Sequence, residues 1–167
     1  MQHTPIDPME ALLENAQSVF ADFRKINNIE TKDPPSGYLL VMERIGKQRC
    51  KGAVISLPLD AVHGNVLIAN AQLNMAAAMK QILHLYTNSN YTTLDLNEQP
   101  NQMGGIRTEE YLIGFGGLLY KQNHDFVIYA LEAFEYFYGP TITACRINKE
   151  GIDAEVKAYE KFKYARN

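Results

Sequence analysis

The short polar connections between β-rich segments constrain the fold of this chain more than any other feature. Residues 38–45 and 52–57 are rich in β-branched and large apolar side chains, and only residues 46–51 separate them. A connection this short joins antiparallel neighbours, because parallel strands need a crossover of roughly a dozen residues or more. The sequence therefore predicts a hairpin and a mainly antiparallel sheet, not a doubly wound parallel one.

Helical segments alternate with these strands, and their apolar residues recur at intervals of three and four. The first follows Asp7, the expected N-cap, and Pro8 at the first helical position, and it extends to residue 26. The second spans residues 71–86, while residues 58–70 before it are ambiguous between strand and helix. The apolar residues that share one face of this second helix are Met75, Ala76, Met79, Ile82, Leu83 and Tyr86.

Two more helices are expected in the second half of the chain. Asn123 is a suitable N-cap for the third, which Gly139 and Pro140 terminate. The fourth spans residues 150–166 and carries a thin apolar stripe. Its charged residues, Glu155 among them, are of both signs and predict a solvated face.

Shorter β-rich segments complete the pattern, and they are residues 91–96, 106–108, 111–115 and 141–147. Helices with one apolar face must cover the sheet that such strands form. The prediction is a single α+β domain over residues 1–167, with a central, mainly antiparallel sheet of about five to six strands flanked by helices.

Composition excludes several classes of protein. The 167 residues are 46% hydrophobic and 21% charged, which supports a core without disulfides or a structural metal. A net charge of −3 lacks the concentrated positive field of a nucleic-acid-binding protein. The most apolar run, residues 111–120, contains glycines and is far shorter than the roughly 20 residues of a membrane span. We therefore expect neither a nucleic acid nor a membrane as a partner.

The N-terminal residues lack the basic and apolar regions of a signal peptide, so the expected location is cytoplasmic. Cys50 and Cys145 match no redox or zinc spacing and are expected to be reduced. Arg49 and Lys51 flank Cys50 and would lower the pKa of its thiol, although a passive surface thiol is the simpler interpretation.

Two glycine pairs are the first candidate site. Glycine admits a ligand close to the backbone, and the start of a helix favours an anion. A carboxylate or phosphate could therefore bind between the second pair and the third helix, with Arg107 as its counter-charge. The alternative is that both pairs are turns or bulges. The candidate ligand-binding residues are Gly104, Gly105, Arg107, Gly116, Gly117, His124 and Asp125.

The four histidines are His3, His63, His84 and His124, and none has a partner at metal-ligand spacing. No metal site is predicted. His124 beside Asp125 could act as an acid or base in an enzyme with a small anionic substrate, and His63 or His124 could be an axial ligand. Solvated surface histidines are the competing interpretation.

A run of three segments resembles the GlcG/HbpS-like family. Gly104-Gly105-Ile106-Arg107 is similar to the GG-[IL]-P-[IL] strand of that family, with Arg107 in the place of proline. Residues 111–117 follow as the glycine-containing return strand, and Asp125 as the acidic residue that opens a helix. The resemblance covers residues 9–138 and leaves residues 139–167 as a C-terminal extension.

This resemblance implies a profilin-like fold and a non-catalytic module that binds or senses a small molecule, with haem as a possible cofactor because some members bind it. It also implies a dimer or higher oligomer. The apolar first helix and the aromatic third helix are the expected surfaces for a homo-oligomer, and a purely structural assembly protein is a further alternative.

Overall fold

The computed structural model describes residues 7–29, 36–56, 64–94, 104–118, 121–139 and 145–165, with the backbone alone at 64–69 and 163. It confirms a single α+β domain with an antiparallel sheet packed against helices. In chain order the elements are α1 (Pro8–Ile26), β1 (Ser36–Glu43), β2 (Cys50–Ser56), α2 (Gly64–Thr87), β3 (Ile106–Arg107), β4 (Tyr111–Gly116), α3 (Lys121–Tyr138) and α4 (Lys149–Ala165).

The sheet has four strands in the order β2-β1-β4-β3, and every neighbouring pair is antiparallel. The predicted hairpin is confirmed, with Tyr38 of β1 opposite Val54 of β2. The expected number of five to six strands is wrong for the described residues, which form a sheet of four. The segments around Thr92 and Ile147 each contribute a single isolated bridge, to Ile106 and Thr108 respectively.

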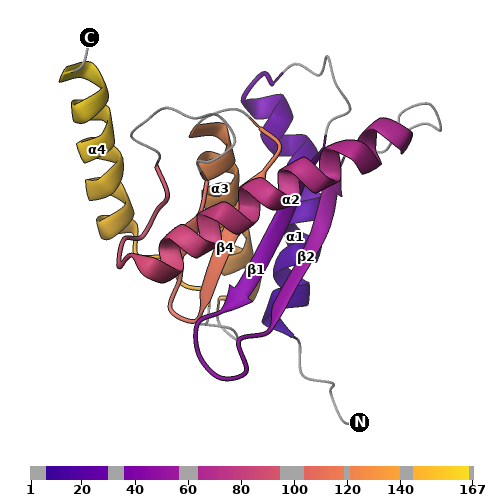
Figure 1. The fold of residues 1–167 in the computed structure, drawn as a ribbon, viewed down its shortest axis with the longest axis horizontal. Coiled ribbons are helices and arrows are strands. Elements are labelled where there is room, and N and C mark those ends of the chain that lie inside the picture. Colours follow the sequence, from indigo (N-terminus) through magenta and orange to yellow (C-terminus); the bar gives the residue numbers. More distant parts are fainter. Residues whose placement is uncertain are drawn as a thin grey trace.

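Helices cover both faces of the sheet (Figure 1). On one face, α1 and α3 pack side by side and bury their apolar stripes, as the periodicity predicts. The centre of this layer is aromatic: the ring of Phe126 lies 5.1 Å from that of Phe20 and 4.6 Å from that of Phe115, measured between centroids. All three side chains are fully buried.

On the opposite face, α2 lies close to the backbone of β4. A Cβ atom at Gly114 would collide with the carbonyl oxygen of Ala78, and one at Gly116 would come within 2.5 Å of the Asn74 carbonyl oxygen. These two glycines therefore let a helix approach the strand more closely than any side chain would allow. The small inward-facing residues of α2 complete this close contact.

The prediction of which α2 residues face the sheet is wrong for every residue of the predicted apolar face except Ile82. Its buried residues are Ala77, Ala78, Gln81, Ile82 and Leu85, whereas Met75, Ala76, Met79, Leu83 and Tyr86 are exposed. The helix has apolar residues around most of its circumference, so periodicity alone does not identify which side packs on the sheet.

A buried side-chain amide replaces a missing strand at the edge of β4. The Phe115 N–H donates to Gln81 Oε1 at 2.7 Å, and Gln81 Nε2 donates to the Phe115 carbonyl at 2.8 Å. Because β3 is only two residues long, it does not reach Phe115. Gln81 thus satisfies two backbone groups that would otherwise be buried without a partner.

Two predicted helix starts are corrected. Residues 64–70 of the ambiguous segment are helical, so α2 begins at Gly64, while residues 58–63 lie outside the described residues. Asn123 is not the N-cap of α3, which begins at Lys121. The Asn123 side chain instead forms a pair of hydrogen bonds with the backbone of Leu118, accepting at 2.8 Å and donating at 3.1 Å. An amide can make both contacts at once, which explains its use within the helix.

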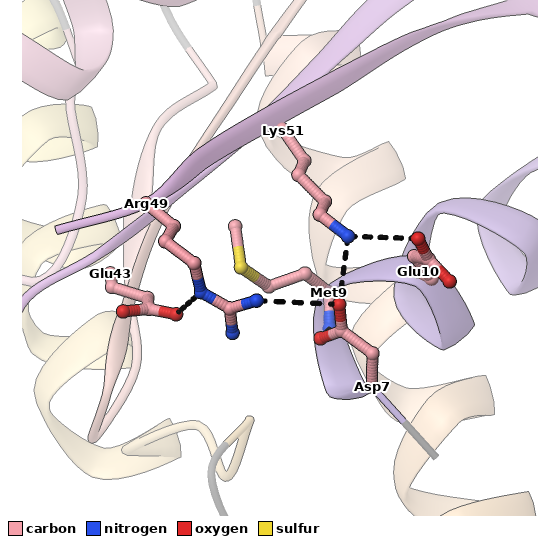
Figure 2. Close-up of polar contacts among 6 residues, drawn as sticks. All are labelled: Asp7, Met9, Glu10, Glu43, Arg49 and Lys51. Atoms are coloured by element: carbon pink, nitrogen blue, oxygen red, sulfur yellow. Dashed lines mark hydrogen bonds and ion pairs between the residues drawn. The ribbon is translucent and has the colours of Figure 1, made fainter. Parts of the chain in front are cut away.

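Ion pairs join the start of α1 to the hairpin (Figure 2). Asp7 caps α1 as predicted, because its Oδ1 accepts from the Met9 N–H at 3.1 Å. Lys51 Nζ lies 2.8 Å from both Asp7 Oδ2 and Glu10 Oε1. The Lys51 ammonium group holds the pKa of Asp7 below its usual value.

Candidate anion-binding site

A cavity of about 510 Å³ lies between the β3–β4 turn and the beginning of α4. Its charged lining residues are Arg44, Arg107, Arg146, Lys149, Glu109 and Glu150. Four cationic side chains thus face two carboxylates in a chain whose net charge is −3. We call this cavity the arginine site.

Arg44 follows β1 and is fixed by the turn between β3 and β4. Its backbone N–H donates to the Glu110 carbonyl at 2.8 Å. Its Nη1 donates to the carbonyl oxygens of Thr108 at 2.9 Å and Glu109 at 2.8 Å. These neutral acceptors orient the guanidinium group without neutralising its charge, and its other N–H groups are free of protein partners among the described residues.

Arg107 extends from β3 across the ring of Tyr91, with its guanidinium carbon 4.6 Å from the ring centroid. This distance is typical of a cation–π contact, which positions the cation and leaves its charge available. Tyr91 also lies against the first turn of α4, where a Cβ atom at Gly151 would collide with the ring. Gly151 therefore lets α4 begin directly beside the aromatic wall of the site.

Glu155 attaches α4 to this wall. Its carboxylate accepts from the Tyr91 N–H at 2.6 Å, from the Thr92 N–H at 2.8 Å and from the Thr92 hydroxyl at 2.6 Å. The prediction that Glu155 belongs to a solvated face is wrong. On its other side the segment pairs with β3, since the Thr93 N–H donates to the Gly105 carbonyl and the Arg107 N–H to the Tyr91 carbonyl, both at 2.9 Å.

The N-terminus of α4 opens on the same cavity. Asn148 caps the helix, with its Oδ1 accepting from the Gly151 N–H at 3.0 Å. The helix dipole places partial positive charge here, next to Arg146 and Lys149. Lys149 forms an ion pair with Glu132, with its Nζ 3.3 Å from Oε1. In contrast, Arg44, Arg107 and Arg146 form no ion pair with any residue that the structure describes.

A smaller hollow of about 400 Å³ adjoins the first, and Arg44 and Arg107 line both. Its other wall includes Leu85 and Tyr86 at the end of α2. The two arginines therefore stand between two hollows, one bordered by α4 and one by α2.

The predicted glycine pairs are closely packed against protein atoms. A Cβ at Gly104 would lie 2.6 Å from the Asn123 Cβ, and one at Gly105 would lie 2.7 Å from Thr93 Oγ1. A Cβ at Gly117 would lie 2.5 Å from the Gly37 Cα. Gly116 is packed as closely against α2, where a Cβ would lie 2.5 Å from the Asn74 carbonyl oxygen. These glycines serve close packing of the chain, and of the candidate residues only Arg107 lines the two hollows.

His124 is 1% exposed and does not line either hollow. Its Nδ1 is 3.5 Å from Oδ1 of Asp125, and its Nε2 has no hydrogen-bond partner in the described part of the chain. His84 is exposed on α2, while His3 and His63 lie outside the described residues. The structure thus brings His124 and Asp125 together, but not with Arg107.

The lowered pKa expected for Cys50 is wrong. Arg49 and Lys51 are engaged by carboxylates of Glu43, Asp7 and Glu10, as Figure 2 shows, and partial desolvation raises the pKa of the Cys50 thiol. Burial raises the pKa of Cys145 further, to about 12. Neither thiol is activated as a nucleophile at neutral pH.

Sequence reasoning missed Arg44, Arg146 and Tyr91. Each lies at the end of a β-rich segment, and no spacing along the chain links them. Cationic residues are frequent within residues 43–51 and 146–150, which is a local signal, but this enrichment does not predict that the two segments meet. Their proximity arises from the pairing of β1 with β4 and from the contact between Glu155 and Thr92.

Comparisons of the chain with protein-family models, curated proteins and solved structures found no significant match. Within the described ranges, no group of three or more His, Cys, Asp or Glu side chains could hold a metal ion. No described helix is both long and apolar enough to cross a membrane.

Proposed function

We propose that this chain is a non-catalytic module that binds a small anionic molecule in the arginine site. The observation that carries this proposal is the convergence of three arginines, none of them ion-paired with a described residue, on a cavity that also receives the N-terminus of α4. Unpaired cations held near one another repel, so a bound anion would stabilise the arrangement.

The chemistry of the walls favours a ligand with two anionic groups, either carboxylates or phosphates. Guanidinium groups form bidentate hydrogen bonds with both kinds of oxyanion. The volume of about 510 Å³ lies within the range of ordinary small-molecule sites, which is roughly 300–1,000 Å³. Tyr91 adds an apolar surface for a short carbon skeleton.

The resemblance to the GlcG/HbpS-like family supports the same class of function. A profilin-like domain of that family would supply a ligand-binding role without a catalytic mechanism. Haem is less well supported than a small anion, because the walls are polar and charged. Neither His84 nor His124 lines the arginine site. A haem titration followed by Soret absorbance, with alanine variants at both histidines, tests this alternative.

The proposal is tested by nuclear magnetic resonance titration with inorganic phosphate and with succinate, at constant ionic strength. Saturable shifts are expected for the amides of residues 107–109 and 148–152. The double variant Arg107→Gln/Arg146→Gln should weaken binding at least about 100-fold, since two lost charge-assisted hydrogen bonds at roughly 1.5 kcal/mol or more each amount to about 3 kcal/mol.

Lys25→Gln is the matched control, because it removes a positive charge from an exposed position of α1 that does not line the site. This variant should bind both anions as the wild type does. Shifts that grow linearly with anion concentration, or equal binding by the control and the double variant, would contradict the proposal.

A further inference from the structure

The outer face of α2 is apolar and nearly free of charge. Its exposed large side chains are Leu73, Met75, Met79, Leu83 and Tyr86, with exposed fractions from 38% to 72%. Lys80 is the single Lys, Arg, Asp or Glu in the 24 residues of the helix. Depletion of charge with enrichment of Met and Tyr is the composition of a protein interface.

Figure 1 shows α2 lying across the sheet with no described element in front of it. The helix therefore covers the sheet with one side and offers the other to the surroundings. Scattered apolar residues on a surface need no explanation, but a continuous stripe along one helix marks an interaction site.

The stripe has the spacing of a helix–helix seam. Gln72, Ala76, Met79, Leu83 and Tyr86 follow one another at intervals of four, three, four and three residues. A seven-residue repeat of this kind keeps one line of side chains facing a second helix along its length. We call these five residues the α2 seam.

We propose that two copies of this chain pair through the α2 seam, with their α2 helices antiparallel. In a pairing centred at Met79, Ala76 of one copy faces Leu83 of the other, so a small side chain meets a large one. Gln72 then faces Tyr86, and an amide meets a phenol. The seam is complementary to itself under a twofold axis, which is the symmetry of most homodimers.

A parallel pairing would lack this complementarity. Ala76 would face its own copy and leave a gap, while Leu83 and Tyr86 would each meet an equally large side chain. Antiparallel helix dipoles also attract each other, whereas parallel dipoles repel. A second copy is therefore the occupant that the pattern favours, over a helix from an unrelated protein.

The exposed area of the α2 seam fits a weak, reversible dimer. A large side chain presents on the order of 200 Å² when fully exposed. At the exposed fractions of Met79, Leu83 and Tyr86, the three large side chains of the seam offer about 320 Å² per copy. Two copies would therefore bury roughly 650 Å² of large apolar side chains, to which Gln72, Ala76 and the flanking Met75 add, so the pair belongs with the small interfaces below about 1,200 Å².

Sedimentation velocity of the full chain over a wide concentration range tests the pairing. The wild type should approach twice the 18.9 kDa mass of one chain. Leu83→Glu should weaken dimerisation about 100-fold, because two carboxylates would be buried in the seam. Leu83 is exposed, so the fold should persist, and circular dichroism together with a second variant, Met79→Glu, checks this.

Tyr136→Glu is the control, because Tyr136 is an exposed aromatic residue on α3, away from the seam, with an exposed fraction of 82%. It should leave the dimer unchanged. A wild type that stays monomeric throughout, or dimers that Tyr136→Glu dissociates and Leu83→Glu does not, would overturn the proposal. Because the arginine site is not involved, anion binding by the Leu83→Glu variant separates this result from the proposed function.

Engineered cysteines test the orientation in a Cys50→Ser background, since Cys50 is exposed and Cys145 is buried. An antiparallel pair brings position 76 of one copy near position 83 of the other. Mixing Ala76→Cys chains with Leu83→Cys chains should therefore give disulfide-linked heterodimers under mild oxidation. Disulfide-linked homodimers of the separate variants, with no gain on mixing, would overturn the antiparallel arrangement.

Discussion

The two helical layers of this protein use their apolar residues in opposite ways. On one face of the sheet, α1 and α3 bury most of their large aromatic side chains, with Tyr136 and Phe137 near the end of α3 as exposed exceptions. On the other, α2 buries Ala77, Ala78 and Gln81 and exposes Met79 and Leu83. The first layer is complete within one chain, whereas the second has an apolar surface still uncovered.

The difference shows that burial follows the shape of the sheet as well as hydrophobicity. Gly114 and Gly116 leave a shallow groove along β4, and α2 places Ala77 and Ala78 against it. Ile82 and Leu85 of α2 are also buried, whereas Met79 and Leu83 on the opposite side of the helix point outward. On the opposite face, β4 presents Ile113 and Phe115, and bulky residues from α1 and α3 interlock with them.

Phe126→Ala should have the largest effect on stability. Phe126 is fully buried among three aromatic neighbours, and its removal leaves a cavity that the rigid layer cannot close. We expect a loss of about 3–5 kcal/mol in the free energy of unfolding, measured by urea denaturation. A loss below about 1 kcal/mol would show that this layer is not tightly packed.

Gln81→Met should be the next most damaging change, and it tests the α2 layer. The substitution keeps the volume but leaves the N–H and C=O of Phe115 without partners. A cost of roughly 2–4 kcal/mol is expected, because each unsatisfied buried group costs about 1–3 kcal/mol. Hydrogen exchange of the Phe115 amide should accelerate in this variant. An unchanged exchange rate would contradict the edge-pairing role of Gln81.

Asp7 should contribute a smaller, pH-dependent amount. Its pKa is lowered from 3.8 in the folded chain, chiefly by the hydrogen bond from Lys51. A carboxyl with a depressed pKa stabilises the fold above its unfolded pKa, and this stabilisation is lost as the pH falls below about 3.8.

Asp7→Ala should therefore cost about 1 kcal/mol at neutral pH, measured by urea denaturation, and less in acid. Asp7→Asn keeps the cap but removes the ion pair, so it serves as the control and should lose less than the alanine variant at pH 7. If the cost of Asp7→Ala is the same at pH 2.5 as at pH 7, the ion pair with Lys51 does not contribute.

Leu83→Gln should have the smallest effect on the stability of the single chain. Leu83 is 58% exposed, so its replacement should change the free energy of unfolding of the monomer by no more than about 0.5 kcal/mol. Thermal denaturation at low protein concentration measures this. A large loss would mean that Leu83 packs within its own chain and that the two layers do not differ as described.

Local pattern was sufficient to predict α1, the β1–β2 hairpin and the polar cap at Asp7. In each, the signal lies within a few residues of the structure that it specifies: an N-cap with Pro8, a short connection, a regular apolar stripe. The fourth helix was also predicted, although the role of Glu155 was not. The sequence around a carboxylate on a helix surface does not indicate which distant backbone amides it will bind.

Of the residues that line the arginine site, only Arg107 was predicted to bind a ligand. The anion was expected between the second glycine pair and the third helix, whereas Arg107 lines a cavity beside α4. Arg44 and Arg107 are separated along the chain and meet because β1 and β3 both lie beside β4. Arg146 and the N-terminus of α4 join them through the contact between Glu155 and the Tyr91–Thr92 backbone. No periodic signal encodes such long-range contacts.

Residue patterns along the chain were thus enough to establish the fold class, the antiparallel hairpin and the approximate positions of the helices, because these depend on interactions between residues near in sequence. The side of α2 that packs on the sheet and the gathering of arginines depended on tertiary structure. Both result from contacts between distant segments, in which steric fit at Gly114 and Gly116 outweighs the hydrophobicity of the larger side chains.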